Sequence, residues 1–163
     1  MKSHEYKVTI CWTGNNGSGT SSYADYSRNH NIVVSGKPSL PASSDTIFRG
    51  DGTRHNPEDM LVASLSSCHM LWYLHLCADA GVIVTSYSDE AVGVLSLRDN
   101  EPSSFSEVLL RPNVTVKEPE MIDRAMELHA EAHAKCFIAN SCNFPVRHEA
   151  TCSVKQLEEA ELG

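Results

Sequence analysis

The stretch HNPEDMLVASLSSCHMLWYL, residues 55–74, predicts the long helix around which the rest of the chain folds. Asn56 can cap the start of this helix, and Pro57 suits its first turn. Two acidic residues then follow at the positive end of the helix dipole. Residues 60–80 contain no proline or glycine, and Gly81 supplies the end. Because the centre of this helix is apolar, we expect it to be buried.

Length and composition predict one soluble globular domain over residues 1–163. The 21 acidic and 13 basic residues give a net charge of −8 without a basic cluster, so nucleic acid is not an expected partner. The start of the chain has no secretory pattern. The longest apolar stretch falls short of the roughly 20 residues that cross a bilayer and is broken by His69 and His75. We therefore expect a cytoplasmic protein without a membrane partner, whose six cysteines are mostly reduced.

The remaining sequence alternates strand-like stretches with a second helix. A hairpin is expected first, and two strand-like stretches follow the long helix. The second helix opens at Pro119, and its residues 122, 125, 126, 129, 132, 133 and 136 fall on one face. The order β-β-(β)-α-β-β-α-β is typical of an α+β domain. The expected strands are residues 6–12, 23–36, 82–99, 105–118 and 146–157, the last followed by an acidic tail.

Two cysteines lie on these helices, Cys68 in the apolar centre of the first and Cys136 at the end of the second. Free cysteine commonly packs as a small buried hydrophobe, which is one interpretation of Cys68. The other is a reactive thiol, which needs a nearby positive group and a second thiol within reach of its sulfenic acid. The sequence can supply both.

The two helical motifs, residues 55–74 and AHAKCFIANSCNFPV at residues 132–146, resemble the OsmC/Ohr family of thiol-dependent hydroperoxide reductases. The resemblance covers nearly the whole chain and implies the OsmC-like fold, in an intertwined homodimer. It also implies that Cys68 attacks the peroxide and that Cys136 resolves the sulfenic acid into a disulfide. Where many members carry a CPYS-type sequence, this chain has CFIANSC, so Cys142 is an alternative resolving thiol.

The resemblance further implies an arginine that activates the thiolate, oriented by Glu58 of the NPE start. Arg49 is the first candidate, Arg28 the second and Arg54 the third. Glu58 and Cys68 are ten residues apart, which is roughly 15 Å along one helix. If both serve one site, they must come from different subunits, which agrees with the family's homodimer.

The expected function is reduction of organic hydroperoxides to alcohols in oxidative-stress defence, with an external dithiol as reductant and no cofactor. Apolar walls formed by Met70, Leu71, Trp72 and Phe137 would favour an organic peroxide. Two alternatives remain open. One is a zinc site formed by His129, His133 and Cys136, with Cys68 or His69 as a fourth ligand. The other is a non-enzymatic stress or small-molecule-binding protein with the same fold.

Overall fold

The computed structural model describes residues 2–154 and has the mixed α+β architecture that the sequence predicts. The chain divides into two compact units, Met1–Leu61 and Val62–Gly163. A single domain over residues 1–163 stays a prediction. The last part of the expected final strand, residues 155–157, and the acidic tail lie outside the described residues.

The first unit contains a three-stranded antiparallel sheet in the order β1-β2-β3. The hairpin of β1 and β2 confirms the expected pairing, although both strands are shorter than the sequence predicts. The loop between them is fastened by the Trp12 indole, which donates a hydrogen bond to the Ser27 carbonyl at 2.8 Å. The sheet is followed by the 3-10 turn η1. The bounds are Thr9–Trp12 for β1, His30–Val33 for β2, Leu40–Ala42 for β3 and Thr46–Phe48 for η1.

Helix α1, Pro57–Asp79, begins at the predicted residue and ends one residue before the predicted Ala80. The Asn56 side chain accepts a hydrogen bond from the Asp59 backbone N–H at 2.7 Å and so caps the first turn. At the other end, Gly81 has a φ of 72°. This left-handed conformation lets the Val82 N–H donate to the Cys77 carbonyl at 2.8 Å, which closes the helix.

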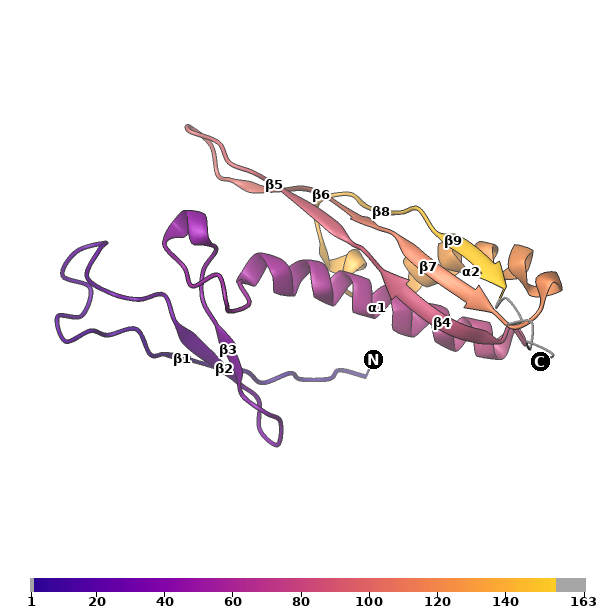
Figure 1. Cartoon of the computed structure of the whole chain (residues 1–163), viewed down its shortest axis with the longest axis horizontal. Helices are drawn as coiled ribbons and strands as arrows, with labels where there is room; N and C mark the ends of the chain where they lie inside the picture. Colours follow the sequence, from indigo (N-terminus) through magenta and orange to yellow (C-terminus); the bar gives the residue numbers. More distant parts are fainter. Residues whose placement is uncertain (1, 155–163) are drawn as a thin grey trace, which may run out of the picture. The chain divides into compact units, whose positions relative to one another are not determined.

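Three long strands of the second unit are each interrupted once, so that they form two three-stranded sheets (Figure 1). The hairpin strands pair antiparallel, and the final strand pairs parallel to their second arm. At the interruption Pro112 has no N–H, and the Asp89 carboxylate accepts from the Arg111 N–H at 2.6 Å. The bounds are Val84–Asp89 for β4, Val92–Ser96 for β5, Ser104–Leu110 for β6, Pro112–Val116 for β7, Val146–His148 for β8 and Thr151–Val154 for β9.

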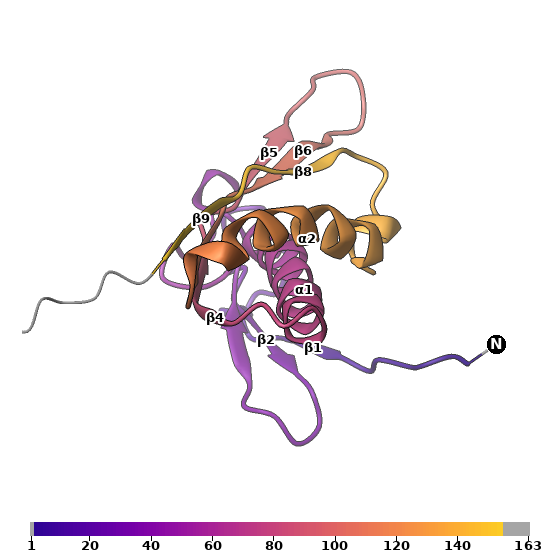
Figure 2. The same cartoon turned by 90° about the vertical axis from the view of Figure 1, so that its right-hand side faces the viewer.

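Helix α2, Ile122–Lys135, follows a 3-10 turn, η2, at Pro119–Met121. Within the second unit, α1 and α2 lie on the same side of β4 and β9 (Figure 2). Tyr73 and Cys77 of α1 pack there against Val114 of β7 and Leu128 of α2. The predicted face of α2 is largely confirmed, but Met126 is exposed and Leu128 is buried instead.

Helix α1 buries only one stripe, Leu65, His69, Tyr73 and Cys77, spaced four residues apart. Its Leu71 side chain is 63% exposed, so the expected burial of the whole helix is wrong for a single chain. By length and composition alone, α1 is also long and apolar enough to cross a bilayer, contrary to the sequence expectation. A core helix of a soluble protein meets the same requirement, and the buried stripe of α1 contributes to the core of the second unit.

Candidate functional site

The structure brings Cys68 and Cys136 together. Cys68 is half-buried on α1, and Cys136 is 2% exposed immediately after the last residue of α2. The two thiols are close enough to interact with each other, and both are free. The two helices therefore bring together a pair of free thiols.

Local backbone geometry determines the surroundings of the Cys136 sulfur. Cys136 has an extended conformation, and its N–H donates to the His133 carbonyl. A 3-10 turn, η3 at Ala139–Ser141, follows directly, and the Ala139 N–H donates to the Cys136 sulfur at 3.4 Å. Burial, reinforced by the neighbouring Cys68 thiol, raises the pKa of Cys136 to about 11, while the Ala139 N–H acts in the opposite direction. Cys136 is a protonated thiol at neutral pH.

Cys142, the alternative resolving thiol, lies at the end of η3 and is half-buried. Its thiol donates to the Ile138 carbonyl at 3.3 Å. Burial raises the pKa of this thiol as well.

An apolar pocket lies beside the cysteine pair. Leu71, Trp72, His75 and Phe137 line a cavity of about 380 Å³. The three helical members follow Cys68 at spacings of three, four and seven residues, which places them on its face of α1. Phe137 directly follows Cys136, and its ring meets the Trp72 ring edge-on at 5.5 Å. Of the four predicted walls, Met70 is not among the lining residues.

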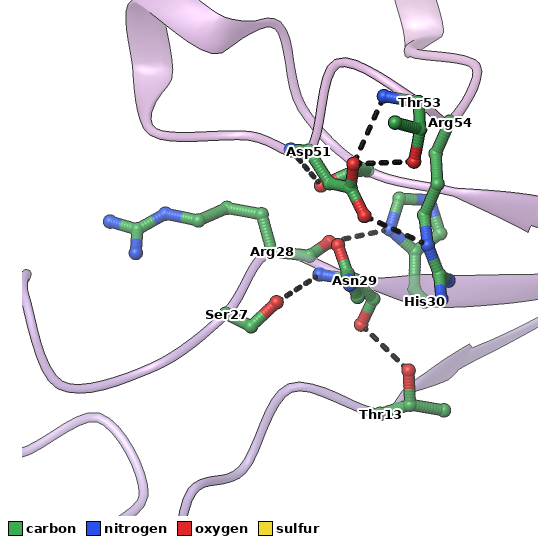
Figure 3. A network of polar contacts seen from close by, with 9 residues as sticks. Thr13, Ser27, Arg28, Asn29, His30, Asp51, Thr53 and Arg54 are labelled. Atoms are coloured by element: carbon green, nitrogen blue, oxygen red, sulfur yellow. Dashed lines mark hydrogen bonds and ion pairs between the residues drawn. The ribbon is translucent and has the colours of Figure 1, made fainter.

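The three candidate arginines lie in the first unit, where two of them are already engaged. The Arg28 guanidinium donates to the carbonyls of Tyr23 and Tyr26 and lies over both rings, 4.2 Å from each centroid. Arg54 pairs with Asp51 at 3.4 Å. Figure 3 shows this pair, with the Arg28 side chain pointing away from it. Both guanidinium groups therefore already have partners within the first unit.

Arg49 and Glu58 differ from these two arginines in having few contacts. Arg49 ends η1 with a φ of 63°, a left-handed conformation that is uncommon for a residue with a side chain. Among the described residues, its guanidinium lies 6.0 Å from the Tyr23 ring centroid. The Glu58 Oε2 atom is buried and has no hydrogen-bond partner within the described residues. A buried carboxylate oxygen without a partner is costly, so Glu58 is a candidate for pairing with an arginine.

The expected zinc ligands do not form a metal site. Among residues 2–154, no group of three histidine, cysteine or acidic side chains is arranged to hold a metal ion. His129 and His133 instead approach His69 and His148. Sequence reasoning considered His69 only as a zinc ligand and missed His148. The available signal was a histidine in the apolar centre of α1 together with the H-x3-H spacing on α2.

An α+β domain with a pair of neighbouring thiols on its two helices defines the class of protein, and comparison with known proteins identifies the family. A family model described as OsmC-like protein matches residues 50–151. The chain therefore belongs to the OsmC-like protein family, which confirms the resemblance seen in the sequence. No curated protein matches the chain.

Solved structures share the fold. An OsmC-like protein of unknown function from Vibrio cholerae is 31% identical, with a TM-score of 0.82 over 91% of this chain and 100% of that one. An organic hydroperoxide resistance protein from Legionella pneumophila is 17% identical, with a TM-score of 0.66 over 95% and 99%. Another, from Elizabethkingia anophelis, is 17% identical, with a TM-score of 0.67 over 94% and 99%. At these identities the last two establish the fold only.

Proposed function

We propose that the chain is a cytoplasmic thiol peroxidase that reduces organic hydroperoxides to alcohols in defence against oxidative stress. The observation that carries the proposal is the contact between the Cys68 and Cys136 thiols. A sulfenic acid on one cysteine becomes a disulfide only if a second thiol can reach it. Some neighbours with the same fold are named organic hydroperoxide resistance proteins, which supports the choice of substrate.

The reaction consumes one peroxide and one external dithiol. The Cys68 thiolate attacks the terminal oxygen of the hydroperoxide, the O–O bond breaks, and the alkoxide takes a proton and leaves as the alcohol. Cys68 is now a sulfenic acid. The Cys136 sulfur attacks it, loses its proton and releases water, which leaves a disulfide. The external dithiol reduces this disulfide by exchange and leaves as its own disulfide. No cofactor takes part.

Cys68 is the attacking thiol because it is half-buried and lies on the pocket face of α1. Cys136 is fully buried, and its raised pKa keeps it protonated until Cys68 has been oxidised. The apolar pocket favours a peroxide with an organic substituent over hydrogen peroxide.

A fixed positive charge must hold Cys68 as a thiolate, and Arg49 is the first candidate. Arg28 and Arg54 are engaged by carbonyls and by Asp51, whereas Arg49 has only its distant ring contact within the described residues. Arg28 is the second candidate. Glu58 would orient the guanidinium through a two-pronged ion pair.

We further propose that the site is shared between two copies of the chain. Helix α1 runs unbroken through Glu58 and Cys68, so the two lie roughly 15 Å apart along its axis. Glu58 of one copy would serve Cys68 of the other. An interface along the exposed apolar face of α1 would bury Leu71 and its neighbours. A monomer in sedimentation at micromolar concentration would contradict this assembly.

Turnover of cumene hydroperoxide with a dithiol reductant tests the roles of the cysteines. We expect Cys68→Ser to abolish turnover and Cys136→Ser to permit about one round before stalling as a sulfenic acid, detected by dimedone labelling and mass spectrometry. Cys11→Ser, at an exposed position, is the control and should be unchanged. If Cys142→Ser stalls and Cys136→Ser does not, Cys142 is the resolving thiol. Full activity in Cys68→Ser would refute the peroxidase proposal.

The arginine is identified by the pH dependence of Cys68 alkylation in Arg49→Met, Arg28→Met and Arg54→Met. The correct replacement should slow both the alkylation of Cys68 and the peroxide step, because it removes the charge that favours the thiolate. Glu58→Gln should cost less, since it only loosens the arginine. Unchanged titration in all three arginine variants would favour the non-enzymatic alternative.

A further inference from the structure

Four histidines from three elements of the second unit, two of them completely buried and two half-buried, form a cluster, which we call the histidine cluster. Its members are His69 on α1, His129 and His133 on α2, and His148 on β8. Ring centroids are 5.3 Å apart for His69 and His129, 5.4 Å for His69 and His148, and 5.6 Å for His133 and His148. His69 and His129 are 0% and 1% exposed. Completely buried imidazoles at this density need a structural or chemical reason.

One hydrogen bond within the cluster joins the two helices that carry the cysteine pair. His69 Nε2 and His129 Nδ1 are 3.0 Å apart, so one neutral ring donates to the other. His69 directly follows Cys68, and His129 lies seven residues, or two helical turns, before Cys136. The Tyr73 ring stacks on His129 at 3.9 Å and restrains it from the side of α1. The bond therefore fixes α1 against α2 beside the thiol pair.

We propose that the hydrogen bond between His69 and His129 positions Cys68 against Cys136 for disulfide formation, and that protonation of both rings releases this restraint. The inference deepens the proposed function and rests on it for its biological meaning. A disulfide forms only when the Cα atoms lie within about 4.4 to 6.8 Å of each other and the side chains point correctly. A small shift of α1 along α2 would take the pair out of that range.

Protonation of both rings removes the bond, because two imidazolium rings are both donors and repel each other. The titratable groups that face the pair are Tyr73 from α1, His133 from α2 and His148 from β8, with Tyr87 of β4 beyond the Tyr73 ring. No described acidic side chain forms an ion pair with the four rings that would offset the charge. Burial and the neighbouring histidines lower the pKa of His69 to about 4 and of His129 to about 3. His69 and His129 are neutral at pH 7 and take up protons only near pH 4 and below.

The test is the equilibrium between the Cys68–Cys136 disulfide and glutathione, which requires no peroxide. The dithiol protein and one molecule of oxidised glutathione exchange with the disulfide protein and two molecules of reduced glutathione, and acid quenching with mass spectrometry counts the disulfide. We expect His69→Leu to lower the equilibrium constant about tenfold at pH 7, since one buried hydrogen bond commonly contributes such a factor. His4→Leu, at an exposed histidine, is the control.

Conservative variants separate positioning from mere packing. Gln can place an amide nitrogen near the position of His69 Nε2, so His69→Gln should keep the equilibrium constant within about twofold while losing its acid sensitivity. The parent should lose disulfide relative to His69→Gln as pH falls from 5 toward 3, the range in which the two buried rings take up protons in the folded chain. These variants remain informative if His69→Leu does not fold.

Three outcomes would overturn the inference. The first is that His69→Leu leaves the equilibrium constant within about twofold of the parent. The second is that the parent and His69→Gln show the same dependence of the equilibrium constant on pH. The third is tight zinc binding by the parent that is lost in His69→Gln, which would mean that His69 is a metal ligand and not a positioning residue. Failure of the proposed function is detected separately. In that case the chain forms the disulfide with oxidised glutathione but does not turn over cumene hydroperoxide, and the histidine variants can still be compared.

Discussion

Acidification from pH 7 to pH 5 should destabilise the second unit through His69 and His129. Both folded-state pKa values, about 4 and about 3, lie below the ordinary value of 6.5. As pH falls below about 6.5, the unfolded chain takes up protons that the folded chain refuses, so the stability present at neutral pH is lost progressively toward pH 4. At pH 5 an unfolded histidine is protonated about 30 to 1, which corresponds to about 2 kcal/mol for each residue. The pair should lower the free energy of unfolding by about 4 kcal/mol, and His148, whose pKa burial also lowers, adds to this loss.

The assay is urea unfolding at pH 7, 6 and 5, followed by Trp72 fluorescence in a Trp12→Phe background so that only the second unit reports. Trp72 packs against the core of that unit. His69→Gln should lose about 2 kcal/mol less than the parent between pH 7 and pH 5, because one of the titrating rings is gone. The control, His4→Gln, removes an exposed histidine and should follow the parent curve.

The described carboxyl groups whose pKa values are shifted do not change protonation state between pH 7 and pH 5. Hydrogen bonds from serine and threonine lower the pKa of Asp25 and Asp51 below their ordinary 3.8, so their contributions change only in stronger acid. If the parent loses less than about 1 kcal/mol, or if His69→Gln loses as much as the parent, the histidines are not held neutral by burial and the reasoning is refuted.

Three further predictions concern stability, measured by urea unfolding followed by circular dichroism. Leu110→Ala should lower the free energy of unfolding by about 2 to 5 kcal/mol because the side chain is completely buried. Leu97→Ala, at an exposed position, should change it by less than about 0.5 kcal/mol, and equal effects of the two substitutions would contradict the assigned burial. Gly93→Ala should cost about 1 to 3 kcal/mol because its Cβ would lie 2.6 Å from the Val62 side chain, and a neutral result would mean that the neighbour yields. Asn56→Ala should cost about 1 kcal/mol through loss of the α1 cap, and Asn56→Asp should retain most of it.

Several elements could be predicted from the sequence because their signals are local. The start of α1 depends on Asn56 and Pro57, and its end depends on Gly81, all within one turn of the helix they bound. The buried face of α2 follows from spacing along a single helix. The exchange of Met126 for Leu128 shows the limit: the two residues lie at opposite edges of the apolar face, and which edge is buried depends on what packs against the helix.

The strand interruptions could not be predicted in this way. Residues 105–118 form one continuous strand-like pattern, yet β6 ends at Leu110 and β7 begins at Pro112. At the break, the Asp89 carboxylate accepts the hydrogen bond of the Arg111 N–H in place of a carbonyl from a neighbouring strand. The same carboxylate accepts a hydrogen bond from the Ser66 hydroxyl of α1 at 2.6 Å. Asp89 and Ser66 lie on β4 and α1, so the residue pattern of the strand itself does not indicate the interruption.

The sequence by itself determined the fold class, the two helices and the two cysteines on them, because helix periodicity and capping act over a few residues. Only the tertiary structure decided that the Cys68 thiol lies beside Cys136, that Arg28 and Arg54 are engaged elsewhere, and that four histidines gather between α1, α2 and β8. His69 and His129 are 60 residues apart in the chain. Their contact depends on how two helices pack against a sheet, since burial and the dielectric surroundings of a side chain are set by neighbours from every part of the unit.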